Sequence, residues 1–377
     1  MKKALSILFI LLSSSNINCH AREIYVSKAI NLFDVNDGGK VVFNTIQEAV
    51  ERARPGDIVT IREGVYYENV SMKTSGNEDD RITVKSHKDE KVIINGSLKN
   101  EPAFKIENAK YIVIDGLEFI EAKKYGIVAL NSSYVRITNC MAYDNQWEGF
   151  LGLHASNVEF IACIGHDNIC DSFNFNDCKD SIMRDCIQYN GGNGLSIERQ
   201  SKNIIVEKCL FYNNWADAIL VYKESESILL KDNIIYDCHY KDPLDNGQGH
   251  GMKITHGNNN VMVINNKIAK CTAAAIYEIA DNGPNIIYDG NIFSEIGARI
   301  PKVPKKAWKD DIIYKGSGDY PKFIGCAWYN LKEIEKNCWG KGNRYDDSEI
   351  IKIENKIKEL KSRGIIADKE DENPSNK

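Results

Sequence analysis

The chain has 377 residues, of which 43% are hydrophobic and 27% are charged, and its formal net charge at pH 7 is −5. This length and composition are ample for a large folded core. The mildly acidic balance gives no indication of a nucleic-acid partner, so an anionic ligand would have to meet a local group of cations.

Residues 1–21 are typical of a secretory signal. Two lysines precede an apolar run from Leu5 to Leu12, and a small-residue exit ends at Ala21. The apolar run is too short to cross a bilayer. We therefore expect a secreted or periplasmic protein whose cleaved form begins near Arg22, with no membrane as partner.

Residues 44–54 (NTIQEAVERAR) predict a short helix near the start of the folded chain. Apolar residues recur at helical spacing from Ile46 to Ala53, with Asn44 or Thr45 as a cap, and the following Pro-Gly-Asp ends the helix. A solenoid needs a cover over its first coil, and one amphipathic helix of this kind can supply it.

A repeat with a period near 23 residues organises the middle of the chain. Four similar segments end in cysteine at intervals of 23 residues: VRITNC at Cys140, VEFIAC at Cys163, SIMRDC at Cys186 and IIVEKC at Cys209. Two further copies end at Asn233 and Asn266. Each copy is a short β-branched run followed by a turn and a second short run. About 23 residues in two or three strands make one coil of a parallel β-helix.

Cysteines at one position of successive coils are expected to stack inward about 4.8 Å apart. Because buried cysteine behaves as a small hydrophobe, we predict that Cys140, Cys163, Cys186 and Cys209 form a core ladder, neither a metal site nor a redox centre. Cys326 and Cys338 are the best candidates for a disulfide.

The segment TIQEAVERARPGDIVTIREGVYYENV, residues 45–70, resembles the N-terminal cap of bacterial right-handed β-helix proteins, many of which are polysaccharide lyases. The prediction is an all-β chain: a right-handed parallel β-helix over residues 22–296 with an N-terminal capping helix. Residues 297–366 are an irregular region leading to an amphipathic helix that covers the end or packs on a flank of the solenoid. A polar, disordered tail over residues 367–377 and a monomeric state are also expected.

Period-two alternation along the second strand of each coil predicts an outward polar face. The first outward column is Leu151, Asn174, Ser196, Leu220, Lys253 and Tyr277. The second is His154, Asn176, Glu198, Tyr222 and Thr255, with His154 offset because Leu153 is expected to point inward. A third column precedes the strands and consists of Glu148, Asp171, Asn193, Asp217, His250 and Ala274.

The strand Gly-His-Gly-Met-Lys-Ile, residues 249–254, follows an insertion around residues 239–248 and resembles the G-N-G-F-K-L strand of the family-nine pectate lyases. The resemblance implies that Lys253 is the Brønsted base and that Asp217 and Asn193 are calcium contacts. The D-D-G-x-D motif of the family is here Ala-Asp-Ala-Ile-Leu around Asp217, so two carboxylates are missing. Asp171 is a partial match to this motif one coil further away. The resemblance thus implies a Ca²⁺ site formed by Asp171, Asn193 and Asp217, a ligand set that is incomplete relative to the family.

Such a site would cleave an acidic, uronate-containing polysaccharide by β-elimination. The charge that develops on the uronate carboxylate needs a cation, and Arg199, Lys223 or His256 can supply one. A lysine base must be largely neutral, which requires desolvation or a neighbouring cation. His250 and His256 assist the leaving oxygen or bind the backbone turn. The remaining expected substrate contacts are Asn174, Glu198, Tyr222 and Tyr277.

Two alternatives stay open. Polygalacturonases also have a G-H-G strand, and inverting hydrolysis needs two carboxyl groups about 6.5–9.5 Å apart. Glu148 with Asp171, or Asp217 with Glu198, are the candidate pairs, although the N-T-D and D-D motifs of that family are not intact. The third class is a non-catalytic carbohydrate-binding solenoid, in which aromatic residues such as Tyr222 serve as stacking platforms.

Overall fold

The computed structural model of the protein describes residues 21–28, 41–239, 249–255, 257–272, 274–279, 286–294, 312–315, 322–324 and 347–367. Several predictions fall outside these residues: the signal segment, the Cys326–Cys338 disulfide, most of the inserted loop, His256, and the tail after residue 367.

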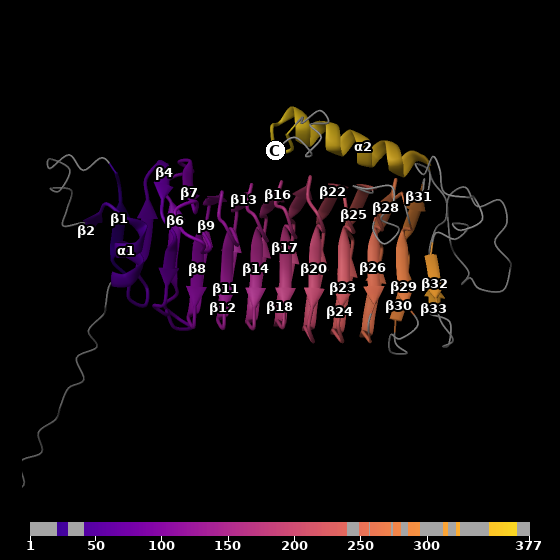
Figure 1. Cartoon of the computed structure of the whole chain (residues 1–377), viewed down its shortest axis with the longest axis horizontal. Helices are drawn as coiled ribbons and strands as arrows, with labels where there is room; N and C mark the ends of the chain where they lie inside the picture. Colours follow the sequence, from indigo (N-terminus) through magenta and orange to yellow (C-terminus); the bar gives the residue numbers. More distant parts are fainter. Residues whose placement is uncertain are drawn as a thin grey trace, which may run out of the picture.

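The described strands form three parallel sheets that wind into one coil after another (Figure 1). Sheet A consists, in spatial order, of β2 (Val41–Phe43), β1 (Glu23–Val26), β3 (Ile58–Ile61), β6 (Ile82–Ser86), β9 (Lys110–Asp115), β12 (Ser133–Thr138), β15 (Ser156–Ile161), β18 (Lys179–Arg184), β21 (Lys202–Glu207), β24 (Glu226–Lys231), β27 (Asn259–Ile264), β30 (Ile286–Asp289) and β33 (Lys322–Ile324).

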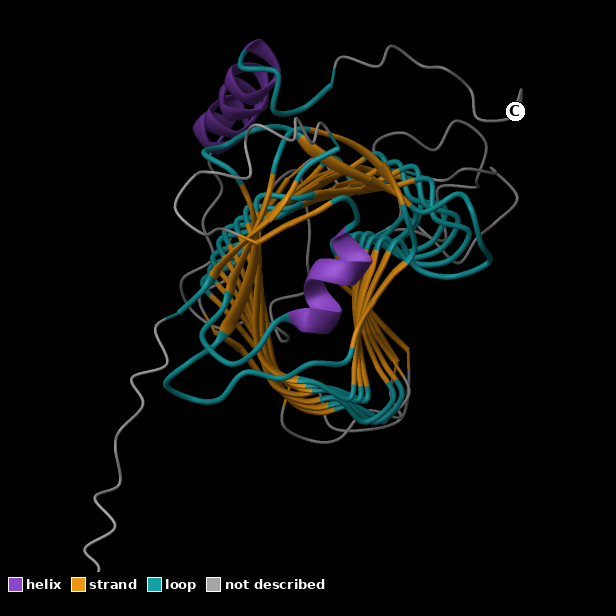
Figure 2. Cartoon of the chain, turned by 90° about the vertical axis from the view of Figure 1, so that its left-hand side faces the viewer, coloured by secondary structure: helices purple, strands orange, loops and turns teal. Residues whose placement is uncertain are grey.

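Each coil continues from sheet A through sheet B into sheet C, as the end-on view of Figure 2 shows. Sheet B consists of β4 (Gly64–Tyr67), β7 (Val92–Asn95), β10 (Glu118–Ile120), β13 (Met141–Tyr143), β16 (Ile164–His166), β19 (Ile187–Tyr189), β22 (Leu210–Asn214), β25 (Ile234–Cys238), β28 (Lys267–Ala269) and β31 (Ile292–Ser294). Sheet C consists of β5 (Val70–Met72), β8 (Phe104–Glu107), β11 (Ile127–Leu130), β14 (Phe150–Leu153), β17 (Phe173–Asn176), β20 (Leu195–Glu198), β23 (Ile219–Tyr222), β26 (Met252–Thr255), β29 (Ile276–Ile279) and β32 (Ile312–Lys315).

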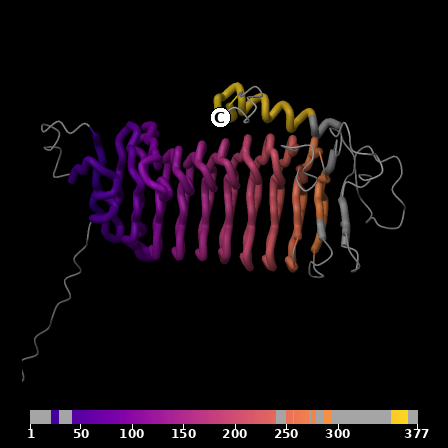
Figure 3. The backbone as a smooth tube through the Cα atoms, viewed as in Figure 1, coloured from indigo at the N-terminus to yellow at the C-terminus, as the bar shows by residue number. Residues whose placement is uncertain are grey.

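Alternation along each strand separates the core from the surface. In β12 and β15 the inward residues Val135, Ile137 and Phe160 are fully buried. Between them, Arg136 and Glu159 point outward on adjacent coils and form an ion pair of 2.7 Å. The coils therefore stack in register, as the regular steps of the backbone in Figure 3 show, and residues distant in sequence line up in columns.

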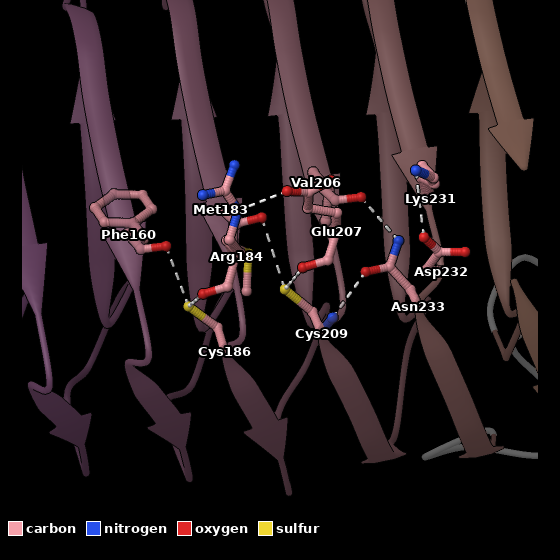
Figure 4. A network of polar contacts seen from close by, with 10 residues as sticks. All are labelled: Phe160, Met183, Arg184, Cys186, Val206, Glu207, Cys209, Lys231, Asp232 and Asn233. Carbon is pink, nitrogen blue, oxygen red and sulfur yellow. Dashed lines mark hydrogen bonds and ion pairs between the residues drawn. The ribbon is translucent and has the colours of Figure 1, made fainter.

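The predicted cysteine ladder is confirmed. Cys140, Cys163, Cys186 and Cys209 are free thiols and at most 2% exposed. The Cys186 thiol donates to the Phe160 carbonyl of the preceding coil at 3.3 Å (Figure 4). Asn233 continues the ladder, since its Oδ1 accepts from the Cys209 backbone N–H at 3.0 Å. Both residue types therefore satisfy backbone groups at the same corner of each coil.

The helix α1 (Ile46–Arg52) lies across the first coil, where Figure 2 shows it in front of the sheets. Thr45 is its N-cap and accepts a hydrogen bond from the Glu48 N–H at 3.2 Å. Ile46, Ala49 and Val50 face the first strands and are fully buried. The helix thus covers the apolar end of the solenoid, as the sequence predicts.

The helix α2 (Asp347–Ser362) packs along the outside of sheet B, on a flank of the solenoid (Figure 1). Ile353 and Ile357 bury against Tyr236 and Ala269. Glu354 accepts a hydrogen bond from the Tyr236 hydroxyl at 2.8 Å and pairs with the Lys270 ammonium at 2.6 Å. Of the two placements expected for this helix, the flank is the one observed, which leaves the outer face of sheet C to other contacts.

Candidate functional site

The outer face of sheet C brings together residues from six coils. The register joins Leu151, Asn174, Ser196, Leu220, Lys253 and Tyr277 in one column. Met252 is fully buried, whereas the Lys253 side chain is 24% exposed. The alternation that carries the site prediction therefore places Lys253 outside the core.

One member of the second outward column was assigned incorrectly. Gly152 is buried and pairs with Phe175, which points into the core. Leu153, which pairs with Asn176, therefore points outward, because alternation continues to the end of β14. His154 lies one residue further on, in the turn, with a φ of 51°.

Lys253 belongs to a compact group that spans three coils. Its ammonium lies 3.6 Å from Asp217 Oδ2 and 5.9 Å from the ring centre of Tyr277. Asp217 Oδ1 accepts from both the backbone N–H and Nδ1 of His250, at 3.1 and 2.8 Å. The His250 ring stacks on Tyr277 at 4.8 Å. We refer to Asp217, His250, Lys253 and Tyr277 as the lysine cluster.

Burial separates the roles within the lysine cluster. Asp217 and His250 are 3% and 2% exposed, so neither presents its side chain to a ligand. The position of His250 is suited to orienting Asp217 and Tyr277 and does not suit direct proton donation to a substrate. Lys253 and Tyr277 are partly exposed and are the members that a ligand on sheet C can reach.

A second group, which we call the acid cluster, occupies the preceding coils and consists of Glu148, Asp171, Asn174, Asn193 and Ser196. Asp171 accepts hydrogen bonds from Asn193 Nδ2 at 3.0 Å and Asn174 Nδ2 at 3.1 Å. Burial, together with the charge of Asp171, raises the pKa of Glu148 to about 7. Burial likewise raises the pKa of Asp171 to about 6, against the opposing effect of its hydrogen bonds.

Several oxygens of the acid cluster are buried without a hydrogen-bond partner. Within the described residues these are Glu148 Oε2, Asn174 Oδ1 and Ser196 Oγ, and Asn176 Oδ1 close by is another. Asn174 and Ser196 are 2% and 0% exposed. A buried acceptor without a donor is costly, and at this exposure Asn174 and Ser196, like Asp217 and His250, do not present their side chains to a ligand.

The expected calcium ligands do not form an open metal site in this arrangement. Both oxygens of Asp171 accept amide protons, Asn193 Oδ1 accepts the Asp217 N–H at 3.1 Å, and Asp217 is engaged by His250 and Lys253. In the part of the chain that the structure describes, no group of three or more His, Cys, Asp or Glu side chains is placed to hold a metal. Calcium dependence stays a prediction.

Arg199, Lys223 and their neighbours line a groove at the corner that follows sheet C. It has a volume of about 620 Å³ and is bordered by His154, Asp177, Arg199, Gln200, Lys223 and Glu224. Lys223 Nζ lies 4.9 Å from the ring centre of Tyr222, and Asn176 Nδ2 reaches Glu198 at 3.4 Å. The predicted site residues Arg199, Glu198 and Tyr222 therefore lie at the corner where the strands of sheet C end. The buried His250 precedes its strand and lies at the opposite edge of the sheet.

Sequence reasoning missed this corner groove, although the chain contains a signal for it. The residue after each strand of sheet C from β8 to β23 adopts a left-handed backbone, with φ of 54° at Arg199 and 56° at Lys223. Asp177 takes the same place one coil earlier, with a φ of 50°. A strand followed by such a turn directs the turn side chain beside the outer face. The recurrence of a polar residue at this turn position in successive coils is the signal in the sequence that indicates the groove.

The acid cluster predicts an unusual pH dependence of stability. Because the folded pKa of Glu148 lies near 7, above its ordinary value of 4.5, the native state retains a proton that the unfolded state loses. Its contribution is fully present below pH 4.5 and is lost as the pH rises through 7. We expect Glu148→Gln to raise the unfolding free energy at pH 8 by on the order of 2–3 kcal/mol, with little change at pH 4.

Urea unfolding at several pH values measures this effect. Glu159→Gln is the control, because Glu159 is half-exposed on sheet A and pairs with the exposed Arg136. The explanation is wrong if Glu148→Gln shows the same difference from the parent protein at pH 4 and pH 8. The neighbouring carboxyls Asp171 and Glu198, whose pKa values are also raised, broaden the transition without reversing its sign.

Among the described residues, neither helix is long and apolar enough to cross a lipid bilayer.

Three parallel sheets that coil around one core, with a polar outer face over one sheet, define the class of parallel β-helix proteins. A family model described as "Pel9A-like, right handed beta helix region" matches residues 24–283. The chain belongs to this Pel9A-like right-handed β-helix family, which confirms the handedness and fold expected from the sequence.

Solved structures of the same fold include polysaccharide lyases. A pectate lyase Pel9A has a TM-score of 0.56 and 12% identity, covering 87% of this chain and 82% of that chain. An alginate lyase from Paenibacillus sp. str. FPU-7 has a TM-score of 0.53 and 16% identity, covering 72% and 95%. At these identities the likeness shows the fold alone.

A curated relative is similar over a shorter stretch. The uncharacterized protein YwoF of Bacillus subtilis (strain 168) is 38% identical over 100 residues, which are 25% of this chain and 21% of that protein. The chain spans about a fifth of the length of the relative it matches.

Proposed function

We propose that the protein is a secreted or periplasmic polysaccharide lyase that cleaves a uronate-containing polymer by β-elimination, with Lys253 as the base. The observation that carries the proposal is the lysine cluster: one partly exposed ammonium stands on the outer face of sheet C, held by a buried Asp217–His250 pair. Membership in a Pel9A-like family and the fold shared with a pectate lyase and an alginate lyase support it.

The reaction begins when the Lys253–Asp217 ion pair opens, the Lys253 ammonium loses a proton to solvent, and the resulting neutral amine faces the substrate. Lys253 takes the proton from the carbon next to the uronate carboxylate, and the electron pair of that C–H bond forms the new C=C bond. The C–O bond to the 4-linked sugar breaks, and its electron pair leaves with the oxygen, which takes a proton from water. Asp217 then receives the lysine ammonium again, and proton loss to solvent restores the base.

The negative charge that builds up on the uronate carboxylate needs a fixed cation. Arg199 and Lys223 follow β20 and β23 in the corner groove, beside the strands that precede Lys253. Both side chains are exposed in this groove, so they can meet a substrate carboxylate from the solvent side. The Tyr277 ring, close to Lys253, offers a face on which a sugar ring can pack.

Incubation of the full chain with a panel of polyuronates tests the proposal. We expect ultraviolet absorbance from the unsaturated product to rise together with new chain ends, and a parallel assay with a calcium chelator tests the predicted calcium dependence. New reducing ends without that absorbance would indicate hydrolysis, for which Glu148 and Asp171 are the candidate carboxyls. Binding without any cleavage would indicate a non-catalytic solenoid.

A further inference from the structure

The outer face of sheet A carries an apolar stripe over its later coils. The strand register joins five outward residues in one column on successive coils: Ile182, Ile205, Leu229, Met262 and Ile287. Ile205 and Met262 are 36% and 38% exposed, and the residues beside each member of the column are buried in the core. The same column holds Arg136 and Glu159 on the two preceding coils, so an apolar residue is not a general requirement of this position.

Charged residues border the apolar stripe on both sides. At the start of the strands, Lys202 pairs with Glu226 of the next coil at 2.9 Å. At the ends of the strands, Glu207 pairs with Arg184 of the preceding coil at 2.5 Å, and Lys231 follows Glu207 in the same column. On β21 and β24 the charge therefore alternates in sign both along each border and across the stripe. An apolar centre within a polar rim is the usual composition of a protein–protein interface.

The two helices cover other parts of the solenoid. Helix α2 packs on residues of sheet B, and α1 packs on the first strands. Among the described residues, neither helix packs on the apolar stripe. A contiguous group of apolar side chains on the surface of a folded protein marks an interaction site.

A second copy of the chain is the partner whose charges fit this surface. Consider a two-fold axis that runs along the strand direction, midway between β21 and β24, so that two copies of sheet A face each other and the solenoids run antiparallel. The axis exchanges β21 with β24, so Lys202 lies opposite the partner's Glu226 and Glu207 lies opposite the partner's Lys231. Ile205 likewise lies opposite the partner's Leu229. Each contact occurs twice by symmetry, and opposite charges then enclose the apolar centre on both borders.

The other two-fold arrangement is less favourable. An axis along the solenoid would place each strand against the same strand of the partner in reverse, and Lys179 at the start of β18 would then lie opposite the partner's Arg184. Like charges placed together oppose association. In the antiparallel arrangement β18 lies opposite β27, whose bordering residues Asn259 and Ile264 are uncharged, so no like charges meet there.

The dimensions of the surface set the strength of the contact. The five coils of the stripe, with strands of up to six residues, cover roughly 24 Å by 20 Å at the usual strand spacing and rise. This is on the order of 500 Å² for each copy and about 1,000 Å² in total, at the lower end of specific interfaces. We therefore expect a reversible dimer with a Kd on the order of 10–100 μM.

We propose that sheet A is the interface of a weak antiparallel homodimer, with Ile205 and Leu229 at its centre. The monomer expected from the sequence is then the form that predominates at low concentration. Sheet C is a separate sheet of the solenoid, so the lysine cluster stays accessible in both copies, and the dimer is independent of the proposed lyase function.

Sedimentation equilibrium of the full chain between about 1 and about 200 μM tests the proposal, because this range brackets the expected Kd. We expect the average mass to rise from one copy toward two. Ile205→Gln should raise the Kd by about tenfold or more, since the two-fold axis places the substitution twice in the apolar centre. Leu98→Gln is the matched control, because Leu98 is 61% exposed in the turn after β7 and lies outside sheet A.

Exchange of the two charges tests the arrangement. Lys202→Glu should weaken the dimer by about tenfold, and adding Glu226→Lys should restore it, because the double variant reverses both signs of one contact. With the axis along the solenoid, the same double variant would meet the partner's Glu207 and Lys231 with like charges and would not recover. Both side chains are exposed, 47% for Lys202 and 39% for Glu226, so the fold should persist, and circular dichroism checks this.

Three results would overturn the proposal. A mass of one copy at every concentration would exclude the dimer and favour another segment of the chain as the cover of the apolar stripe. A dimer that Ile205→Gln leaves unchanged would use a different surface. A double charge variant that dimerises no better than Lys202→Glu would exclude the antiparallel arrangement.

Discussion

Replacing Lys253 by methionine is expected to lower the rate of unsaturated-product formation by roughly 10²–10⁴-fold, the usual contribution of a positioned general base. Methionine keeps much of the length of the side chain and removes the amine. The buried Met252 and the register of β26 do not depend on the lysine, so the fold should persist. Initial rates followed by ultraviolet absorbance, with circular dichroism to confirm folding, measure the effect.

The chain provides a closely matched control in Lys105. It occupies the same outward column, through the register of β8 with β11 and β14, but lies several coils from the lysine cluster. Its side chain is also 24% exposed, and its ammonium is also 3.6 Å from a carboxylate, that of Glu107. Lys105→Met should retain nearly full activity. Equal losses from the two substitutions, or full activity in Lys253→Met, would rule out Lys253 as the base.

The fold was predictable from the sequence because each coil repeats the same local chemistry. Equal spacing of Cys140, Cys163 and Cys186 indicates the length of a coil. Asn233 occupies the cysteine position in a later coil, and its side-chain amide also satisfies backbone groups at that corner. The position of α2 was predictable only in part. Its apolar face indicated that it packs on the solenoid, but the residues that receive it, such as Tyr236 on sheet B, cannot be identified from spacing alone.

The candidate site was predictable where it depends on register, and less so where it depends on side-chain direction. Alternation placed Met252 inside and Lys253 outside. It did not show that His250 is buried against Asp217, because a loop residue before a strand has no fixed side-chain direction. It also could not show that Asp171 directs both oxygens at amides, which depends on the rotamers of Asn174 and Asn193.

Replacing Asp217 by alanine is expected to lower the unfolding free energy by about 3 kcal/mol or more, because removal of one partner of a buried pair leaves the other without compensation. Asp217 is 3% exposed and accepts from the His250 N–H and Nδ1, so alanine would leave two buried donors without an acceptor. Asp217→Asn keeps one oxygen acceptor and should cost about half as much. Chemical denaturation measures both values.

The Asp177–His154 pair gives the control for the Asp217–His250 pair. It has the same residue types and a similar distance, 2.9 Å from Nδ1 to Oδ2, but its side chains are 43% and 49% exposed. Asp177→Ala should therefore change stability by no more than about 1 kcal/mol. Because Asp217 also holds the Lys253 ammonium, both Asp217 variants should lose activity, including the better folded Asn variant. An Asp217→Asn protein that is stable and fully active would show that the buried pair supports the coil and has no part in positioning the base.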